Sequence, residues 1–307
     1  MTPPLVHLGL HRTGSTWFQT RVLDGRDGRP VNACADRAES TRRLVLARDL
    51  DYDPSSTRDW AAEAFARAAR EGHAPVMSNE RFSGNPAAGW NDAERTARRI
   101  ADAIPDAKVL LVVREQVDLL RSIWLQQIRI GGICGIEDFL RPPEPGDHRL
   151  PVPDPSFLMF DRYVDLLDEA FGRDRVLVLP FEMLRSDTEA FLARVTAFSG
   201  IPMPAPADAG PVYAAPSLLW SAVMRRVNLL SCRTSLHRAP PFPWLHGPGK
   251  RLAGLAGRLA TARGERRRRT RATTEIRRRL ASFPVADSNR RLGERLSLDL
   301  ADFGWCT

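Results

Sequence analysis

The sequence predicts an α/β fold, in which helices flank a parallel β-sheet, followed by a mainly helical C-terminal part. The clearest strand is the run Lys-Val-Leu-Leu-Val-Val at residues 108–113, which is almost continuously apolar, as a parallel strand covered on both faces should be. Over residues 1–200, further short apolar runs alternate with helical patterns, and the connections are long enough to cross over the sheet. Past Gly200 the pattern changes to helical segments separated by Pro-rich stretches.

Each expected element rests on its own local pattern. The first strand is a short apolar run, and a polar turn containing Gly14 follows it before a helical pattern starts at Trp17. Residues 24–58 are polar and are expected to be irregular. The expected strands lie at residues 5–10, 74–78, 108–113 and 175–179. The expected helices lie at residues 59–70, 91–103, 115–130, 156–171, 187–199 and 287–300.

Length and composition indicate a globular protein, because 43% of the 307 residues are hydrophobic and 27% are charged. We expect one domain over residues 1–307, with an α/β core at 1–200 and a helical, Arg-rich extension at 201–307. Residues that carry chemistry begin by Gly9, which leaves no room for a signal peptide, and no apolar run could span a bilayer. The four cysteines lie far apart without metal-ligand spacing, which favours a reduced, cytoplasmic protein.

The net charge of +8 is unevenly distributed along the chain. Residues 249–279 hold 12 basic and two acidic residues, a net charge of +10, so the rest of the chain carries −2. This segment fits a solvated basic helix, and binding of an anionic acceptor and a peripheral contact with an acidic membrane are the alternatives. The run of four arginines at residues 266–269 contains no aromatic residue that could stack on bases, so we expect no nucleic-acid partner.

The sequence Gly-Leu-His-Arg-Thr-Gly-Ser-Thr at residues 9–16 follows a strand and opens a helix. That arrangement is typical of an anion site, because backbone N–H groups of the turn and the helix start point at a phosphate. The pattern is P-loop-like, but a Walker A loop needs Lys directly after its second Gly, where this chain has Ser15, and its basic residue is Arg12. The sequence therefore disfavours an ordinary ATPase. The candidate anion-binding residues are Arg12, Thr13, Gly14, Ser15, Thr16 and Trp17.

A second candidate anion site follows the clearest strand. Arg114 stands at the end of that strand, and Ser122 lies eight residues later in the following helix. Ligands of open parallel sheets bind at the carboxyl ends of the strands, so both side chains are placed to reach a second phosphate.

Taken together, the two motifs resemble those of sulfotransferases that use 3′-phosphoadenosine 5′-phosphosulfate (PAPS), and the chain is similar to the bacterial sulfotransferase domain. Residues 9–16 resemble the family's 5′-phosphosulfate loop, and residues 110–124 resemble its 3′-phosphate motif. The resemblance covers residues 5–201, and the tail at 287–293 is also similar to the family's ending. Further matches lie at residues 77–84, 127–132, 179–184 and 198–201.

The resemblance implies transfer of a sulfuryl group from PAPS to a hydroxyl or amine of a glycan or small metabolite such as a natural product. The products are the sulfated acceptor and adenosine 3′,5′-bisphosphate, and no metal is expected. Arg12 and the N–H groups of the loop would stabilise charge on the 5′-phosphate, while Arg114 and Ser122 would hold the 3′-phosphate. Glu80 is the first candidate for the general base. His11 is the second candidate, or else a donor to a sulfate oxygen.

Two departures from the family pattern matter. Many members carry Pro-Lys where this chain has His11 and Arg12, and an Arg keeps the positive charge but cannot donate a proton as Lys can. The third 3′-phosphate contact has no clear counterpart, although Gly249-Lys250-Arg251 offers a Gly-containing basic sequence.

Two other functions remain open at this point. A nucleotide or small-molecule kinase with a divergent phosphate loop would use ATP and Mg²⁺. A basic module that binds nucleic acid or an acidic membrane would act through the C-terminal arginines. The sequence leaves the acceptor and the oligomeric state open.

Overall fold

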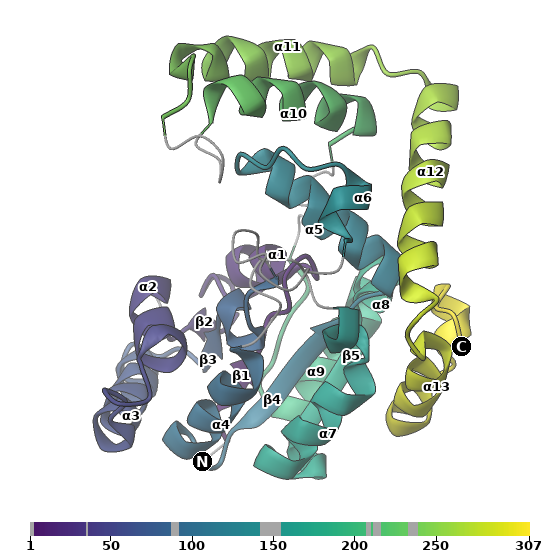
Figure 1. Ribbon diagram of the computed structural model, residues 1–307. Coiled ribbons are helices and arrows are strands. Elements are labelled where there is room, and N and C mark those ends of the chain that lie inside the picture. The colour runs from purple at the N-terminus through teal and green to yellow at the C-terminus, as the bar shows by residue number, and fades with distance from the viewer. Residues whose placement is uncertain are drawn as a thin grey trace.

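The central feature is a sheet of five parallel strands in the order β2-β3-β1-β4-β5 (Figure 1). The computed structural model describes residues 3–34, 36–86, 92–141, 155–206, 210, 216–232 and 239–307. The strands are β1 (Leu5–His7), β2 (Val31–Asn32), β3 (Pro75–Ser78), β4 (Lys108–Val113) and β5 (Val176–Pro180). Helices flank the sheet, so the predicted α/β class is confirmed.

The helices follow the expected alternation with the strands over the first 200 residues. Those of the α/β part are α1 (Ser15–Trp17), α2 (Arg37–Ser40), α3 (Pro54–Arg70), α4 (Ala93–Ala103), α5 (Gln116–Arg129), α6 (Ile136–Phe139), α7 (Phe160–Phe171), α8 (Phe181–Ser186) and α9 (Thr188–Ser199). The C-terminal part holds α10 (Leu218–Ser231), α11 (His246–Arg258), α12 (Ala262–Leu280) and α13 (Val285–Leu296). Shorter turns of helix are η1 (Phe18–Val22), η2 (Thr41–Leu46), η3 (Glu80–Ser83), η5 (Pro155–Leu158), η6 (Arg173–Arg175), η7 (Pro243–Leu245) and η8 (Leu300–Phe303).

Strand β4 shows why its sequence is apolar at nearly every position. Successive side chains of a strand point to opposite faces of the sheet. Val109, Leu111 and Val113 belong to the larger apolar core with α4, α5 and α7. Leu110 and Val112 belong to a second core with η1, α8 and α9. Both faces of the sheet are therefore covered, which holds the strand ends in fixed positions.

The prediction of an irregular segment at residues 24–58 was wrong. The structure places α2, η2 and the start of α3 in this segment. Asp36 caps α2 by accepting hydrogen bonds from the backbone N–H groups of Ala38 and Glu39. In η2 only Leu44 and Val45 are fully buried. These turns are too short and too polar to produce a helical apolar period.

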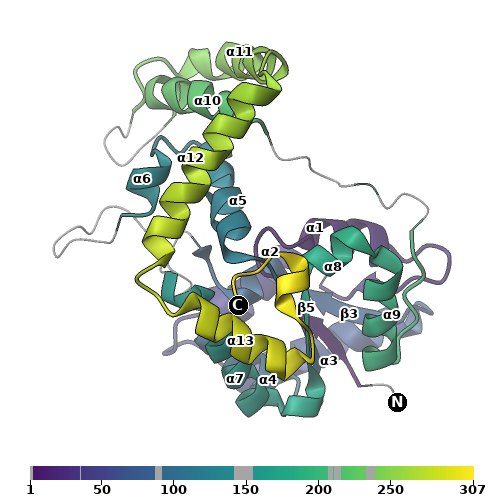
Figure 2. The ribbon, with the colours of Figure 1, turned by 90° about the vertical axis from the view of Figure 1, so that its right-hand side faces the viewer.

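The C-terminal part leaves the sheet and then returns to it. Helices α10 and α11 form a hairpin beyond α5, and α12 leads from it back to α13 (Figures 1 and 2). Helix α13 packs against α7, where Arg295 forms an ion pair with Asp168 at 2.6 Å. Asn289 of α13 accepts a hydrogen bond of 2.6 Å from Gln116 at the start of α5. Within the described ranges, no helix has the length and apolar character needed to cross a membrane.

Candidate functional site

The candidate site lies where the chain leaves β1, β3 and β4. Strand β1 pairs with β3 on one side and with β4 on the other, and His7 stands level with Ser78 and with Leu110. Because all three strands are parallel, the segments that follow them meet at the same edge of the sheet. These segments carry the predicted phosphate loop, the predicted base Glu80 and Arg114.

The loop after β1 adopts a conformation that depends on its glycines. Gly14 has a φ of 84° at the N-cap of α1, in the left-handed region that favours glycine. A Cβ on Gly9 would lie only 2.6 Å from the Ser15 hydroxyl, so the loop can fold back on itself only without a side chain there. Thr13 Oγ1 and Ser15 Oγ both donate to the Leu10 carbonyl, at 2.6 and 3.2 Å. The loop is thus held by internal hydrogen bonds.

The structure brings the two predicted phosphate motifs into direct contact. Arg12 Nε donates a hydrogen bond of 2.8 Å to Ser122 Oγ. Arg114 Nη1 donates one of 2.8 Å to the Arg12 carbonyl. The Arg114 guanidinium also lies 4.8 Å from the centre of the Phe181 ring and 3.7 Å from an Asp118 oxygen. Both positive charges are therefore held at the carboxyl edge of the sheet.

Burial and neighbouring positive charge lower the pKa of each of these two arginines. Burial lowers the pKa of Arg12, and the nearby charge of Arg129 lowers the pKa of Arg12 further. Burial also lowers the pKa of Arg114. Arginine stays protonated in proteins, so both side chains remain cationic. Concentrated, partly desolvated positive charge of this kind favours an anionic ligand.

Polar atoms without partners mark the same region. Arg114 Nε and Trp17 Nε1 are buried N–H donors with no hydrogen-bond acceptor among the described residues. Leaving a buried donor unsatisfied costs about 1–3 kcal/mol, and the cost is larger for a charged group. An oxyanion that supplies acceptor oxygens would remove this cost, so the donor set fits a phosphate or sulfate group.

His11 lies in the loop as a neutral imidazole. Burial lowers the pKa of His11 to about 4, although a hydrogen bond to the Gly84 backbone and the charge of Glu80 act in the opposite direction. The ring nitrogen Nε2 is buried and has no hydrogen-bond partner among the described residues. In a neutral imidazole one ring nitrogen donates a hydrogen bond and the other accepts one, so His11 fits both of its expected roles.

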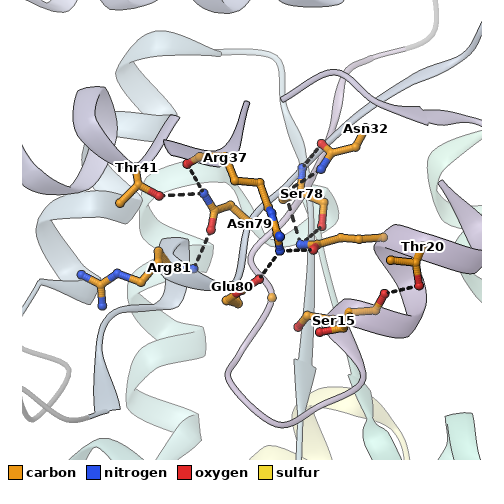
Figure 3. Close-up of polar contacts among 12 residues, drawn as sticks. Ser15, Thr20, Asn32, Arg37, Thr41, Ser78, Asn79, Glu80 and Arg81 are labelled. Carbon is orange, nitrogen blue, oxygen red and sulfur yellow. Dashed lines mark hydrogen bonds and ion pairs between the residues drawn. The ribbon is translucent and has the colours of Figure 1, made fainter. Parts of the chain in front are cut away.

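Glu80 lies at the start of η3, directly after Asn79 (Figure 3). Its Oε2 is 3.5 Å from Arg37 Nη1, and the same arginine nitrogen donates to Gln19 Oε1 at 3.1 Å. The turn is fixed by the Asn79 side chain, which donates to Ser40 Oγ and accepts from the backbone N–H of Arg81, both at 2.9 Å. The strand end thus presents a carboxylate beside the positive charge of Arg37, and Oε2 of that carboxylate is buried with no hydrogen-bond partner among the described residues.

Arg37 and Gln19 were not predicted from the sequence. Arg37 belongs to α2, which lies in the segment that was expected to be irregular. Gln19 follows the phosphate loop by only a few residues, and its side chain donates to Ser78 Oγ at 3.1 Å. The position of Gln19 one turn after the loop was the one signal that could have indicated a role for it.

His7, Glu182 and Gly249 make contacts of a structural kind. His7 Nδ1 pairs with Ser78 Oγ at 2.8 Å in the core, as expected of a structural histidine. Glu182 accepts from the Glu115 backbone N–H and from Trp305 Nε1, each at 3.2 Å, which is a structural role. Gly249 packs against Val227 in the α10–α11 hairpin and is not brought to the loop. Among the described residues, no three His, Cys, Asp or Glu side chains gather closely enough to hold a metal ion.

Two solved structures resemble the chain over most of its length. A sulfotransferase from Alicyclobacillus acidocaldarius matches with a TM-score of 0.54 and 16% sequence identity over 99% of both chains. The sulfotransferase domain of the olefin synthase of Synechococcus PCC 7002 matches with a TM-score of 0.38 and 13% identity, over 89% of this chain and 93% of that one. No protein-family model and no curated protein sequence matches. The first likeness shows that the chain has the fold of a sulfotransferase structure from end to end.

Proposed function

We propose that the protein transfers a sulfuryl group from PAPS to a hydroxyl or amine of a glycan or small-metabolite acceptor. The observation that carries this proposal is the contact between the two phosphate motifs, in which Arg12 binds Ser122 and Arg114 binds the Arg12 backbone. PAPS carries a phosphate at the 3′ position of its ribose and a phosphosulfate at the 5′ position. A binding site for it therefore needs two adjacent anion subsites. The fold shared with a sulfotransferase structure agrees with this proposal.

The proposed donor-binding residues are those of the two anion subsites. Arg12 and the backbone N–H groups of residues 13–17 would hold the 5′-phosphosulfate, while Arg114 and Ser122 would hold the 3′-phosphate. The unpartnered Nε of Arg114 and Nε1 of Trp17 fit a ligand that supplies acceptor oxygens. PAPS supplies the activated sulfuryl group in this reaction.

The chain contributes positioning and electrostatic stabilisation. By analogy with phosphoryl transfer, the group moves in line between an attacking and a leaving oxygen through a loose transition state. Negative charge then grows on the leaving phosphate, and the fixed cation Arg12 stabilises it. Because arginine does not release its proton, Arg12 acts through its charge and its N–H donors only. The Ser122 hydroxyl limits the directions in which the Arg12 side chain can point.

The acceptor hydroxyl loses a proton as it attacks, and Glu80 is the proposed general base. Arg37 Nη1 lies 3.5 Å from Glu80 Oε2, so its charge favours the ionised carboxylate, and Oε2 has no hydrogen-bond partner among the described residues. His11 is the second candidate, because its neutral ring carries an unpartnered Nε2 in the same loop.

Isothermal titration calorimetry with adenosine 3′,5′-bisphosphate, AMP and ATP tests the proposal. We expect the bisphosphate to bind without Mg²⁺ and more tightly than AMP, because only the bisphosphate fills both anion subsites. Equal binding of all three nucleotides, or no binding, would overturn the proposal. Tight binding of ATP only with Mg²⁺ would indicate a kinase instead.

A further inference from the structure

The α10–α11 hairpin carries most of the large hydrophobic side chains that are exposed in the described part of the chain. Seven of the ten large hydrophobic side chains exposed in the described ranges lie on it or at its tip: Leu229, Leu230, Phe242, Trp244, Leu252, Leu255 and Leu259. The hairpin lies beyond α5, away from the sheet, in both ribbon views (Figures 1 and 2). Exposed apolar side chains that gather on one element indicate an interaction surface.

One face of helix α11 packs against α10, and one flank of the helix is exposed. Gly249 and Ala253, four residues apart, are the buried residues of this helix. A Cβ on Gly249 would lie 2.3 Å from Val227 of α10, so the two helices approach closely there. Leu252 and Leu255 are 59% and 55% exposed, and Leu259 just past the helix is 78% exposed. Their spacing of three and four residues places them on one flank of the helix.

The tip of the hairpin adds two aromatic side chains. Phe242 and Trp244 stand edge to face with ring centres 6.2 Å apart, and Trp244 is 70% exposed. The backbone N–H of Phe242 donates to the Leu230 carbonyl at 3.0 Å, which ties this tip to the end of α10. Tryptophan is well suited to a boundary between water and an apolar phase, because its ring is apolar and its N–H is polar.

The charged residues within the hairpin sequence are all basic, although the Glu265 carboxylate of α12 accepts from the backbone N–H groups of Leu218 and Leu219 at the start of α10. Between Asp208 and Glu265 the sequence contains no Asp or Glu. It contains eight basic residues there: Arg225, Arg226, Arg233, Arg238, Lys250, Arg251, Arg258 and Arg263. On α11, Lys250, Arg251 and Arg258 are exposed, and none of the three has an ion-pair partner within the described ranges. The exposed leucines are therefore accompanied by uncompensated positive charge.

Helix α12 has more basic residues than α11, but several of its arginines pair with neighbouring groups of the protein. Arg271 forms an ion pair with Glu137 of α6 at 2.8 Å, and Arg279 Nε donates to the Leu140 carbonyl at 3.0 Å. Arg278 pairs with Glu275 within the helix at 2.5 Å. No large hydrophobic side chain of α12 is exposed, since Ile276 and Leu280 are buried. Of these two helices, only α11 carries exposed large hydrophobic side chains beside its basic residues.

We propose that the α10–α11 hairpin docks on the surface of an anionic lipid bilayer. An amphipathic helix with leucines on one flank and Lys or Arg beside them lies in the plane of the headgroups, with its apolar side chains in the acyl boundary. Anionic headgroups neutralise the basic residues. A second copy of the chain is a poor occupant, because two identical hairpins would bring their unpaired positive charges together. The proposal is independent of the sulfuryl-transfer function.

Flotation of the full-length protein with vesicles tests this proposal. We expect the protein to float with phosphatidylcholine vesicles that contain phosphatidylglycerol, and to remain behind with pure phosphatidylcholine. The triple change L252Q/L255Q/L259Q should lower the partition coefficient by at least about tenfold, because it removes the apolar side chains from the acyl boundary. Glutamine keeps high helix propensity, and these positions are exposed, so thermal unfolding should be unchanged. The Trp emission should shift to the blue on vesicles containing phosphatidylglycerol, and the W244F variant should lose that shift.

The matched control removes charge from α12. The variant R266S/R267S/R268S loses three exposed arginines, as many charges as K250S/R251S/R258S loses on the hairpin. We expect the hairpin variant to lose vesicle binding and the α12 variant to retain most of it. No binding to phosphatidylglycerol vesicles, or binding that the leucine changes leave intact, would overturn the proposal. A dimer in lipid-free buffer that L252Q/L255Q/L259Q converts to a monomer would show that a second copy covers the surface instead.

Discussion

Arg12 and Ser122 are 110 positions apart in the sequence, yet Arg12 Nε donates a hydrogen bond of 2.8 Å to Ser122 Oγ. One residue comes from the loop after β1 and the other from α5, which follows β4. The contact uses one of the five N–H donors of the guanidinium and leaves the others for a ligand. The two candidate anion subsites are therefore adjacent, and one ligand with two anionic groups can occupy both.

The first prediction separates the two subsites by changing Arg114. We expect Arg114→Ala to weaken binding of adenosine 3′,5′-bisphosphate by about 10–100-fold, the size of a lost hydrogen bond to a charged group. Binding of AMP, which has no 3′-phosphate, should change much less. Calorimetry with both nucleotides measures the difference. Ser122→Ala should show the same preference with a smaller loss of about 3–10-fold, since its hydroxyl is neutral.

Arg98→Ala is the control for a loss of positive charge, because Arg98 lies on α4 and pairs with Glu94. It should leave both affinities unchanged. If Arg114→Ala weakened AMP and the bisphosphate equally, Arg114 would not hold the 3′-phosphate. Its hydrogen bond to the Arg12 carbonyl would then be its main role.

The second prediction concerns the charge of Arg12. Arg12→Ala should lower turnover by at least about 100-fold, because removing one preorganised donor to a developing anion costs that much in other enzymes. Arg12→Lys should retain more activity than Arg12→Ala, since it keeps the positive charge. Turnover is measured as adenosine 3′,5′-bisphosphate formed from PAPS with an acceptor found by screening hydroxyl compounds. Equal activity of the alanine and lysine variants would contradict a role for the charge.

The sheet was predictable because most of its buried strands appear in the sequence as short apolar runs. Strand β4 is apolar on both faces, and its neighbours β1 and β5 are shorter runs of the same kind. Strand β2 was missed, since it has only two residues, Val31 and Asn32, both half-buried. A strand that short has no period, and its place in the sheet is set by pairing with β3.

The candidate site was predictable where the sequence carries a motif. Arg12 and Arg114 follow apolar strands, so the edge they share could be deduced from parallel topology. Their contact through Ser122 and the Arg12 carbonyl depends on side-chain directions that spacing alone does not give. The role of Arg37 could not be predicted, because a polar helix outside every motif brings it to Glu80.

The third prediction distinguishes the two candidates for the general base. Glu80→Gln should lower turnover by at least about 100-fold, the usual contribution of a general base, and leave bisphosphate affinity unchanged. His11→Gln should have a smaller effect on turnover. Steady-state kinetics and calorimetry on the same samples separate chemistry from donor binding.

Glu94→Gln serves as the matched control, because Glu94 is an exposed carboxylate on α4. Its turnover and its affinity for the bisphosphate should equal those of the unchanged protein. Near-normal turnover of Glu80→Gln together with a large loss in His11→Gln would reverse the assignment and make His11 Nε2 the base.

The fourth prediction concerns stability at acidic pH and arises from His7. Burial lowers the pKa of His7 to about 3, and its Nδ1 pairs with Ser78 Oγ in the core. In the unfolded chain this imidazole titrates near its ordinary value of about 6.5. The unfolded state therefore binds the proton first, so the contribution of His7 is complete above about pH 6.5 and is lost as the pH falls toward 3. At pH 5 the loss from this one group is about 2 kcal/mol.

Urea unfolding at pH 7 and pH 5 measures this effect. His7→Asn keeps an amide that can bond Ser78 and removes the titrating ring, so its free energy of unfolding should fall by about 2 kcal/mol less than that of the unchanged protein between these two pH values. Both proteins contain the same carboxylates and the same His11, whose pKa burial lowers to about 4. The contributions of these groups therefore cancel when the two decreases in the free energy of unfolding are compared. Equal drops would mean that His7 takes up its proton in the folded protein without loss of stability, and would contradict the lowered pKa of this buried side chain.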